Sequence, residues 1–286
     1  MIKKLRRAFK ILRLISLFIV VFLGAWAFWY EPSSLSVNQY ELKIPNWNSQ
    51  LNNYKIVALA DIHGGSAYIT EAKLRRIVEL VNAENPDLIV LLGDYVSQKL
   101  LDHKSLRMPM KTIADNLSGL HSRDGVFAVI GNHEQYDEVN VKRELERVGI
   151  RVLINEIVPL EANNQRLWIL GVEDYWKRRR VKIDEPLQKV AAGEPVLAIT
   201  HNPDIFVQLE NTPISLLMAG HTHGGQCNFP IIGAPIVPSD FGQRFLSGHI
   251  IENDRHLFVS RGIGTTGPPV RFGAPPEISI LTISRN

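Results

Sequence analysis

The sequence is organised around the stretch Leu216-Leu217-Met218-Ala219-Gly220-His221-Thr222-His223-Gly224-Gly225. An apolar run ends there at a glycine, and two histidines follow. Alternate side chains of an extended backbone share a face, so His221 and His223 point to the same side. Neutral imidazole is the commonest side-chain ligand for metals. By itself the stretch fits a metal site or a surface turn with two histidines, and the rest of the chain has to decide between them.

Four other apolar runs end in polar residues of the same kind. They are residues 56–60, before Asp61 and His63; 88–92, before Asp94; 126–130, before Asn132 and His133; and 196–200, before His201. Short continuous apolar runs are typical of strands buried on both faces. Helical spacing is found in between, in residues 71–81, 108–120, 139–148 and 205–210. Because open α/β sheets bind ligands beyond the carboxyl ends of their strands, we expect these polar groups to converge on one edge.

The residues at these strand ends are histidines, aspartates and one asparagine. Mixed nitrogen and oxygen ligands suit Mn, Fe, Zn or similar ions and disfavour a thiolate site. Eight polar groups are too many for a single catalytic metal that must keep an open position. Two ions about 3.5–4 Å apart, joined by a carboxylate, would instead lower the pKa of a shared water and produce a bridging hydroxide that attacks phosphorus. A histidine that is not a ligand could protonate the leaving group.

These groups resemble, in order, the five sequence blocks of the calcineurin-like metallophosphoesterases, and the resemblance covers about residues 50–286. The blocks read Asp61-X-His63, Gly93-Asp94, Gly131-Asn132-His133-Glu134, His201 and Gly220-His221-X-His223. The resemblance implies an α/β fold, namely a two-sheet β-sandwich flanked by helices, and a phosphoester hydrolase that uses two divalent metal ions.

The same resemblance implies a role for each residue. Asp94 would bridge the two ions, His133 would act as acid or transition-state stabiliser, and Glu134 would orient its loop. The ligands of the first ion would be Asp61, His63 and His223, and those of the second ion would be Asn132, His201 and His221.

A narrower resemblance is to bacterial exported or membrane-anchored phosphodiesterases of the YkuE and YaeI type, which are related to UDP-diacylglucosamine pyrophosphohydrolases. It is carried by residues 200–204, 220–226, 260–264 and 269–272. Ala60 stands where a serine is common, but it is not a ligand. Arg261 and Arg271 follow the metal blocks and could bind a substrate phosphate through their guanidinium groups, although a salt bridge within a loop fits them equally well.

Residues 14–30 form an uncharged apolar segment, at the short end of what spans a bilayer. Trp26, Trp29 and Tyr30 at its far end are typical of a membrane interface. Six cations precede it, so the positive-inside rule predicts a cytoplasmic amino terminus and residues 31–286 on the periplasmic or extracellular side. We expect residues 1–30 to be a membrane anchor. A cleaved signal fits residues 25–27, a twin-arginine signal fits residues 6–7, and a buried core helix is the third alternative.

The charge of the remaining chain argues against nucleic acid as a partner. Without those six cations, 26 basic residues remain against 29 acidic ones, a net charge of −3. A mildly acidic body lacks the basic track that nucleic-acid binding needs. Residues 177–182 hold a basic cluster that fits either a solvated face or contact with anionic lipid headgroups. The single cysteine, Cys227, excludes an internal disulfide.

The sequence pattern after the predicted anchor indicates a tether. Pro32, Ser33 and Ser34 interrupt the helical pattern, and residues 39–44 alternate polar and apolar as a half-exposed strand does. We expect residues 31–50 to form a tether and edge strand, and residues 51–286 the catalytic domain. The tether favours an envelope- or lipid-linked phosphodiester or pyrophosphate as substrate. A broad phosphomonoesterase, or a tethered metal-binding protein without turnover, stays open as an alternative.

Overall fold

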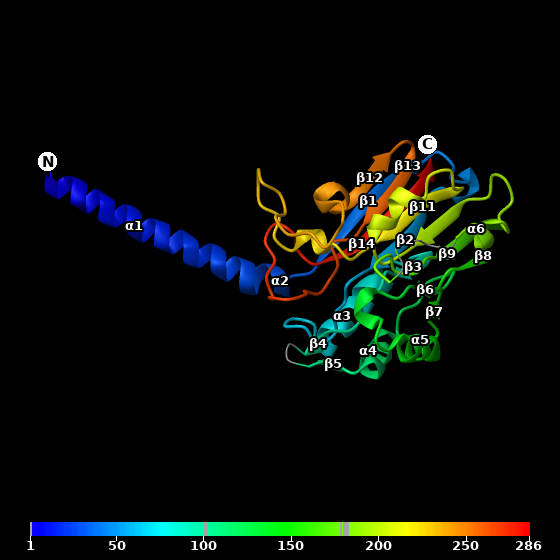
Figure 1. The fold of residues 1–286 in the computed structure, drawn as a ribbon, viewed down its shortest axis with the longest axis horizontal. Helices are drawn as coiled ribbons and strands as arrows, with labels where there is room; N and C mark the ends of the chain where they lie inside the picture. The colour runs from blue at the N-terminus through cyan, green and yellow to red at the C-terminus, as the bar shows by residue number, and fades with distance from the viewer. Residues whose placement is uncertain (1, 100–101, 178, 180–182) are drawn as a thin grey trace.

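A long helix projects from a layered α/β body in the computed structural model of the chain (Figure 1). The structure describes residues 2–99, 102–177, 179 and 183–286. The helix comprises α1 (Ile2–Ala25), a π-helical turn η1 (Trp26–Tyr30) and the short α2 (Glu31–Ser33). Residues Lys3–Ser33 form one helix that is long and apolar enough to cross a membrane. Its apolar side chains are exposed, as Leu17 and Phe18 illustrate.

The described part of the body contains two six-stranded sheets and a small hairpin. The first sheet has the order β1 (Ser36–Ile44), β14 (Glu277–Arg285), β2 (Tyr54–Leu59), β3 (Leu88–Leu91), β6 (Val126–Ala128) and β7 (Arg151–Val152). The second has the order β12 (Gly248–Glu252), β13 (Arg255–Val259), β11 (Ile214–Ala219), β10 (Val196–Ile199), β9 (Gln165–Gly171) and β8 (Glu156–Ala162). The hairpin pairs β4 (Gln98–Lys99) with β5 (Asp102–Leu106).

Helices cover the outer face of each sheet. On the first sheet they are α3 (Glu71–Ala83), α4 (Met110–Leu117) and α5 (Glu138–Arg147). On the second they are α6 (Asp184–Leu187) and the 3₁₀ turns η4 (Pro203–Gln208) and η6 (Gly242–Phe245). Two further 3₁₀ turns, η3 (Asn132–Glu134) and η5 (His223–Gly225), follow β6 and β11, and η2 (Ser49–Leu51) precedes β2.

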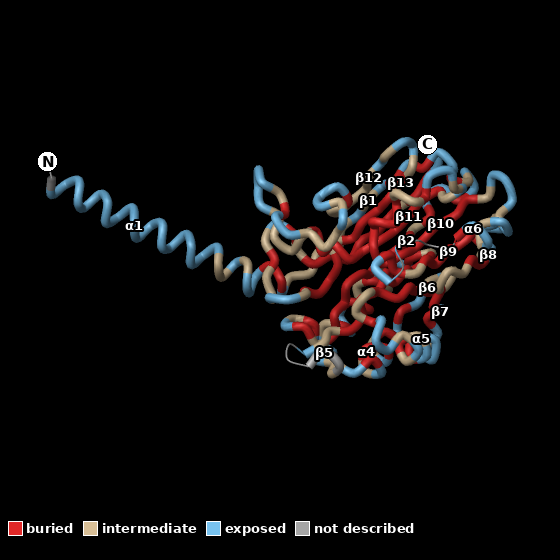
Figure 2. The backbone as a smooth tube through the Cα atoms, in the orientation of Figure 1, coloured by how far each residue is buried: buried red, intermediate tan, exposed pale blue. Residues whose placement is uncertain are grey.

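The core consists of three apolar layers, which Figure 2 shows as a buried interior under exposed loops and helix faces. Because strand side chains alternate, Val57 and Leu59 of β2 pack against the helices, whereas Ile56 and Ala58 pack against the second sheet. Burying one such large apolar side chain contributes about 1.5–3 kcal/mol, so the central layer rigidly fixes both sheets. The loops that follow the strands are therefore held by a rigid core.

Strand direction places the ends of several central strands beside the apolar helix. β14 runs parallel to β1, with Ser36 opposite Glu277, and antiparallel to β2, with Ser279 opposite Ala58. The end of β2 therefore lies at the same edge as the start of β1, directly after α2. We call this edge, where β2, β3, β6, β10, β11 and β13 finish, the front end of the sandwich, and the other the back end.

The predicted architecture is confirmed: two sheets flanked by helices, with one amino-terminal apolar helix. The prediction that Pro32 and Ser33 interrupt the helix is wrong, because α2 continues to Ser33 and proline is tolerated in the first turn of a helix. The edge strand begins earlier than expected, at Ser36. The predicted helix at 205–210 is a 3₁₀ turn, and strands β8, β12, β13 and β14 were not predicted.

Candidate metal centre

The front end brings together all eight polar residues that follow the apolar runs. Backbone hydrogen bonds join neighbouring strand ends: Asp61 N donates to Gly93 O at 3.0 Å, and Gly220 N donates to His201 O at 2.9 Å. The residues are Asp61, His63, Asp94, Asn132, His133, His201, His221 and His223. Asn132 and His133 are half-buried and the others are buried.

One group of ligand atoms comes from the segments that follow β2 and β11. His63 Nε2 lies 3.2 Å from His223 Nε2, and His223 Nε2 lies 3.5 Å from Asp61 Oδ1. The backbone N–H of His221 donates to both oxygens of Asp61, at 3.1 and 3.0 Å, and so fixes that carboxylate. These three side chains can hold one ion between them.

A second group surrounds His201, with Asp94 between the two groups. His201 Nε2 lies 3.0 Å from Asn132 Oδ1 and 3.0 Å from His221 Nδ1. Asp94 Oδ2 lies 3.3 Å from His201 Nε2 and 3.6 Å from His63 Nε2. A single carboxylate oxygen therefore faces an imidazole of each group.

The donor set fits cations. The Nδ1 atom of His63 contacts the carbonyl oxygen of Val96 at 3.1 Å, and a carbonyl can only accept, so the ring proton lies on Nδ1. The lone pair of Nε2 then faces both His223 and the carboxylate of Asp94. His221 Nδ1 is turned toward a neighbouring imidazole in the same way, since it lies 3.0 Å from His201 Nε2. Converging lone pairs and a carboxylate repel one another unless positive charge lies between them.

The electrostatics of three of the histidines agree with this interpretation. Burial lowers the pKa of His63 to about 4, and burial also holds the pKa values of His221 and His223 well below the usual range. These rings are neutral at physiological pH, as metal ligands must be. Burial alone would raise the pKa of Asp94, but the imidazoles of His201 and His133 hold it well below the usual range.

The backbone at these ligands adopts an uncommon conformation. Positive φ angles occur at Asp61 (51°), His63 (47°), Asp94 (56°), His221 (72°) and His223 (53°). Each costs on the order of 1–2 kcal/mol for a residue with a side chain. Such strain concentrates at functional sites, where the surrounding structure imposes it. The strained turns aim the side chains toward one point.

Glu134 connects the segment that follows β3 with the segment that follows β6. Its buried carboxylate accepts hydrogen bonds from the backbone N–H groups of Asp94 (2.9 Å), Tyr95 (2.8 Å), Val96 (3.1 Å) and Gly131 (2.9 Å). Gly131 allows this approach, because a Cβ there would lie 2.2 Å from Asp94 Oδ1. The loops that carry Asp94 and His133 are therefore fixed relative to each other.

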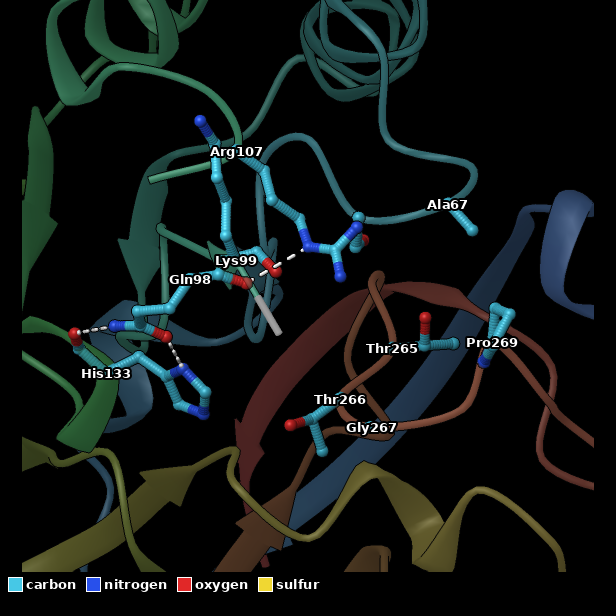
Figure 3. A pocket seen from close by; sticks show the side chains of 11 residues that line it. Ala67, Gln98, Lys99, Arg107, His133, Thr265, Thr266, Gly267 and Pro269 are labelled. Atoms are coloured by element: carbon cyan, nitrogen blue, oxygen red, sulfur yellow. Dashed lines mark hydrogen bonds between the residues drawn. The ribbon is translucent and has the colours of Figure 1, made fainter. Parts of the chain in front are cut away.

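His133 lies at the open side of the cluster, and Gln98 holds its ring. Its Nδ1 contacts Gln98 Oε1 at 2.6 Å, and Gln98 Nε2 donates to His133 O at 2.7 Å (Figure 3). Its Nε2 lies 3.9 Å from Asp94 Oδ2. Sequence reasoning missed Gln98, because it lies in the hairpin after Asp94 and in none of the sequence blocks.

A cavity of about 240 Å³ opens beside His133. Lys99 and Arg107 line it on one side, and Thr266 and Gly267 on the other (Figure 3). Both cations are exposed, and Arg107 Nε donates to the carbonyl of Gln98 at 3.0 Å. The cavity thus offers positive charge and hydroxyl groups next to the metal cluster.

The two arginines predicted to bind substrate have other partners. Arg261 Nη2 lies 2.6 Å from Glu277 Oε2, a fully buried carboxylate. Arg271 is itself fully buried, and its guanidinium donates to backbone carbonyls, including Gly264 O at 2.6 Å and Ala274 O at 2.7 Å. Neither guanidinium lines the cavity beside His133, so these contacts give no support to the substrate-binding prediction.

The basic cluster at residues 177–182 is described only in part. Lys177 pairs with Glu138 and Glu173, and Arg179 pairs with Asp240. Arg178, Arg180 and Lys182 lie outside the described residues. The described members therefore have acidic partners within the chain.

Comparisons with known proteins agree with this site. The family model for calcineurin-like phosphoesterases matches residues 54–225. The chain is 31% identical over 234 residues to phosphodiesterase YaeI of Escherichia coli, covering 80% of this chain and 82% of that protein. It is 33% identical over 282 residues to a metallophosphoesterase of Aquifex aeolicus (93% and 98%), and 27% identical over 261 residues to the metallophosphoesterase YkuE of Bacillus subtilis (90% and 88%).

Proposed function

Because the chain belongs to the calcineurin-like phosphoesterase family and is a metal-dependent phosphoester hydrolase, we propose that it cleaves phosphodiesters or pyrophosphates with two divalent ions bound at the front end. One observation supports two ions and not one: the same oxygen of Asp94 faces His63 of the first group and His201 of the second. A carboxylate in that position serves two ions better than one.

The ligands divide accordingly. We assign Asp61, His63 and His223 to the first ion, Asn132, His201 and His221 to the second, and Asp94 to both. Nitrogen and oxygen donors without thiolate suit Mn, Fe or Zn. Ions bound there would supply Lewis acidity and lower the pKa of a water molecule at neutral pH.

The side chains around the ions bind the substrate and deliver a proton. Hydrolysis adds water across a P–O bond, and the leaving oxygen takes up a proton. A doubly protonated His133 can supply it from Nε2. Its Nδ1–H donates to Gln98 Oε1, which turns the other edge of the ring toward the cluster. Lys99 and Arg107 can bind the phosphate oxygens, or a second phosphate, in the adjoining cavity.

A paired assay tests the reaction. The full chain in detergent, loaded with Mn, is given bis(4-nitrophenyl) phosphate and 4-nitrophenyl phosphate, in parallel with His133→Ala. We expect turnover of the diester that depends on metal and falls by about 10²–10⁴-fold in the variant, the usual contribution of general acid–base catalysis. Preference for the monoester would favour a phosphomonoesterase. No turnover of either, with metal bound, would leave a metal-binding protein without activity.

We further propose that residues 1–30 anchor the protein, that residues 31–50 are the tether and edge strand, and that residues 51–286 form the catalytic domain on the periplasmic or extracellular side. The cations before the apolar helix support this orientation. A substrate linked to lipid or to the cell envelope would then lie within reach of the site. A carboxyl-terminal alkaline phosphatase fusion should be active in cells, and a silent, stable fusion would reverse the orientation.

A further inference from the structure

A loop at the front end exposes several apolar side chains. Residues 226–238 contain no charged residue, and Ile231, Ile232 and Ile236 are 105%, 66% and 79% exposed. We call residues 229–237 the isoleucine loop. A cluster of this kind on a protein surface marks an interaction site more often than chance exposure does.

The isoleucine loop has a defined conformation. Phe229 and Gly233 exchange backbone hydrogen bonds of 2.9 Å, which close a tight turn, and Ala234 N donates to Gln243 Oε1 at 3.1 Å. Ile231 at the tip has a φ of +78°, which β-branched residues rarely adopt. The turn therefore holds an isoleucine outward at a conformational cost.

The base of the loop is joined to the end of the membrane helix. Asn228 N donates to Phe272 O at 2.7 Å, and the rings of Phe229 and Phe272 lie 5.3 Å apart. The neighbouring Arg271 N donates to the carbonyl of Ala27 in the helix at 3.0 Å. In Figure 1 the loop, coloured gold, lies on the side of the body from which α1 leaves, and Figure 2 shows its tip exposed.

A second contact fixes the helix to the same part of the body. Glu31 accepts a hydrogen bond from Ala274 N at 2.7 Å and another from Trp26 Nε1 at 2.8 Å. Trp29 and Tyr30, both exposed, lie on the last turns of the helix before this contact. Exposed tryptophan and tyrosine at the end of an apolar helix are typical of the level of lipid headgroups.

Because these contacts join the base of the loop to the end of the helix, we propose that the isoleucine loop inserts into the lipid bilayer beside the helix. The loop would then be a second membrane contact of the protein. The aromatic end of the helix and the loop would enter the same leaflet. The front end of the sandwich, with its metal cluster, would then face the headgroups, where lipid phosphoesters lie. The inference rests on the proposed membrane anchor, but it does not require catalytic activity.

Site-specific fluorescence on the full chain tests the insertion. Single cysteines replace Ile231, Ile251 or Val20 in a Cys227→Ala background, and each variant carries the environment-sensitive dye NBD in nanodiscs of phosphatidylethanolamine and phosphatidylglycerol. Ile251 is the matched control, since it is an exposed isoleucine near the back end of β12. Val20, in the middle of α1, is the positive control for the anchor.

We expect NBD at 231 to emit at shorter wavelength than at 251 and to be quenched several-fold more by nitroxide-labelled lipid than by aqueous iodide. The dye at 251 should show the opposite preference. Quenching by lipid at 20 but not at 231 would overturn the loop insertion while the anchor stands. A blue shift at 231 without lipid quenching would also overturn it, because a second copy of the chain would then cover the loop. No lipid quenching at 20 would overturn the anchor and the loop insertion together.

Discussion

The two ends of the sandwich differ in chemistry although both are hollowed. A cavity of about 490 Å³ at the back end is lined by residues such as Trp47, Glu194 and Arg285. The front end has a cavity of about 240 Å³ beside His133. Among the described residues, the groups able to hold a metal all lie at the front end. Cavity size therefore does not identify the site, whereas strand direction does.

The metal-binding groups gather at the front end because the central strands pair in parallel. β2, β3 and β6 run the same way in the first sheet, as do β10, β11 and β13 in the second, so their last residues meet at one end. The loops there turn through left-handed residues such as Asp61 and His221, which aim polar groups inward. A change at the front end can therefore be compared with a similar change at the back end.

Asp94→Asn should have the largest effect. It weakens the ligand that faces both groups, and Lewis-acid stabilisation is worth several kcal/mol, so turnover of bis(4-nitrophenyl) phosphate should fall by about 10³-fold or more. Metal content by mass spectrometry should fall with it. Arg285→Gln, at the back-end cavity, should change neither quantity. Retention of both ions and of activity in Asp94→Asn would refute the bridging role.

Glu277→Gln should have the next largest effect, on stability. The variant leaves the guanidinium of Arg261 without its buried partner, which should lower the free energy of unfolding by about 3 kcal/mol. Glu161→Gln breaks an exposed pair with Arg166 at the back end and should cost less than about 0.5 kcal/mol. Denaturant unfolding in detergent measures both.

The effect of Glu277→Gln should depend on pH in one direction. Burial alone would raise the pKa of Glu277, but Arg261 holds it below its ordinary value of 4.5. A depressed pKa in the folded state gives stability that is complete above pH 4.5 and is lost as the pH falls through the folded value. The stability difference between wild type and Glu277→Gln should therefore shrink below pH 4.5. A constant difference down to pH 3 would contradict the ionised pair.

Gly131→Ala and Gly193→Ala should separate crowding from backbone strain. At Gly131 a Cβ would lie 2.2 Å from Asp94 Oδ1, so overpacking should cost about 2 kcal/mol and displace that carboxylate. At Gly193, in the back end, nothing lies within 4 Å, and the φ of +85° alone should cost about 1 kcal/mol. Thermal unfolding and turnover, measured together, should show lost activity only for Gly131→Ala.

Gln98→Ala should have the smallest effect. It removes the acceptor that orients His133, and loss of such a partner should lower kcat about tenfold while KM and metal content stay unchanged. Gln98→Glu, which keeps an acceptor oxygen, should recover most of the rate. Gln165→Ala is the control at the back end. Equal loss of kcat in the alanine and glutamate variants would indicate that Gln98 acts in another way.

Much of the fold could be predicted because burial leaves a direct record in the sequence. Strands 56–60, 88–92, 196–200 and 214–219 are apolar on both faces, and each ends at a glycine, aspartate or histidine. β14 is different: it was not predicted, although it connects β1 to β2. Its pairing joins the two ends of the chain, and such long-range register is set by packing, which local pattern does not encode.

In the candidate site, too, local sequence pattern predicted some features and only packing decided others. Strand-end motifs identified Asp61, His63, Asp94 and the other ligand candidates, because metal chemistry restricts which residue types can stand there. Arg271 fitted either substrate binding or a salt bridge within a loop, and its guanidinium is enclosed by backbone carbonyls. An arginine in a loop looks the same in sequence whether its guanidinium faces a cavity or the interior.

The sequence by itself determined which strand ends carry polar groups and that an apolar helix precedes them, because residue type and periodicity are local properties. Only the tertiary structure decided which groups meet. Asp94 reaches both His63 and His201 because two sheets face each other across a packed core, and Gln98 reaches His133 because a hairpin folds back over it. The isoleucine loop likewise lies beside the helix through contacts between residues more than 200 positions apart, since distance in space depends on packing and not on chain order.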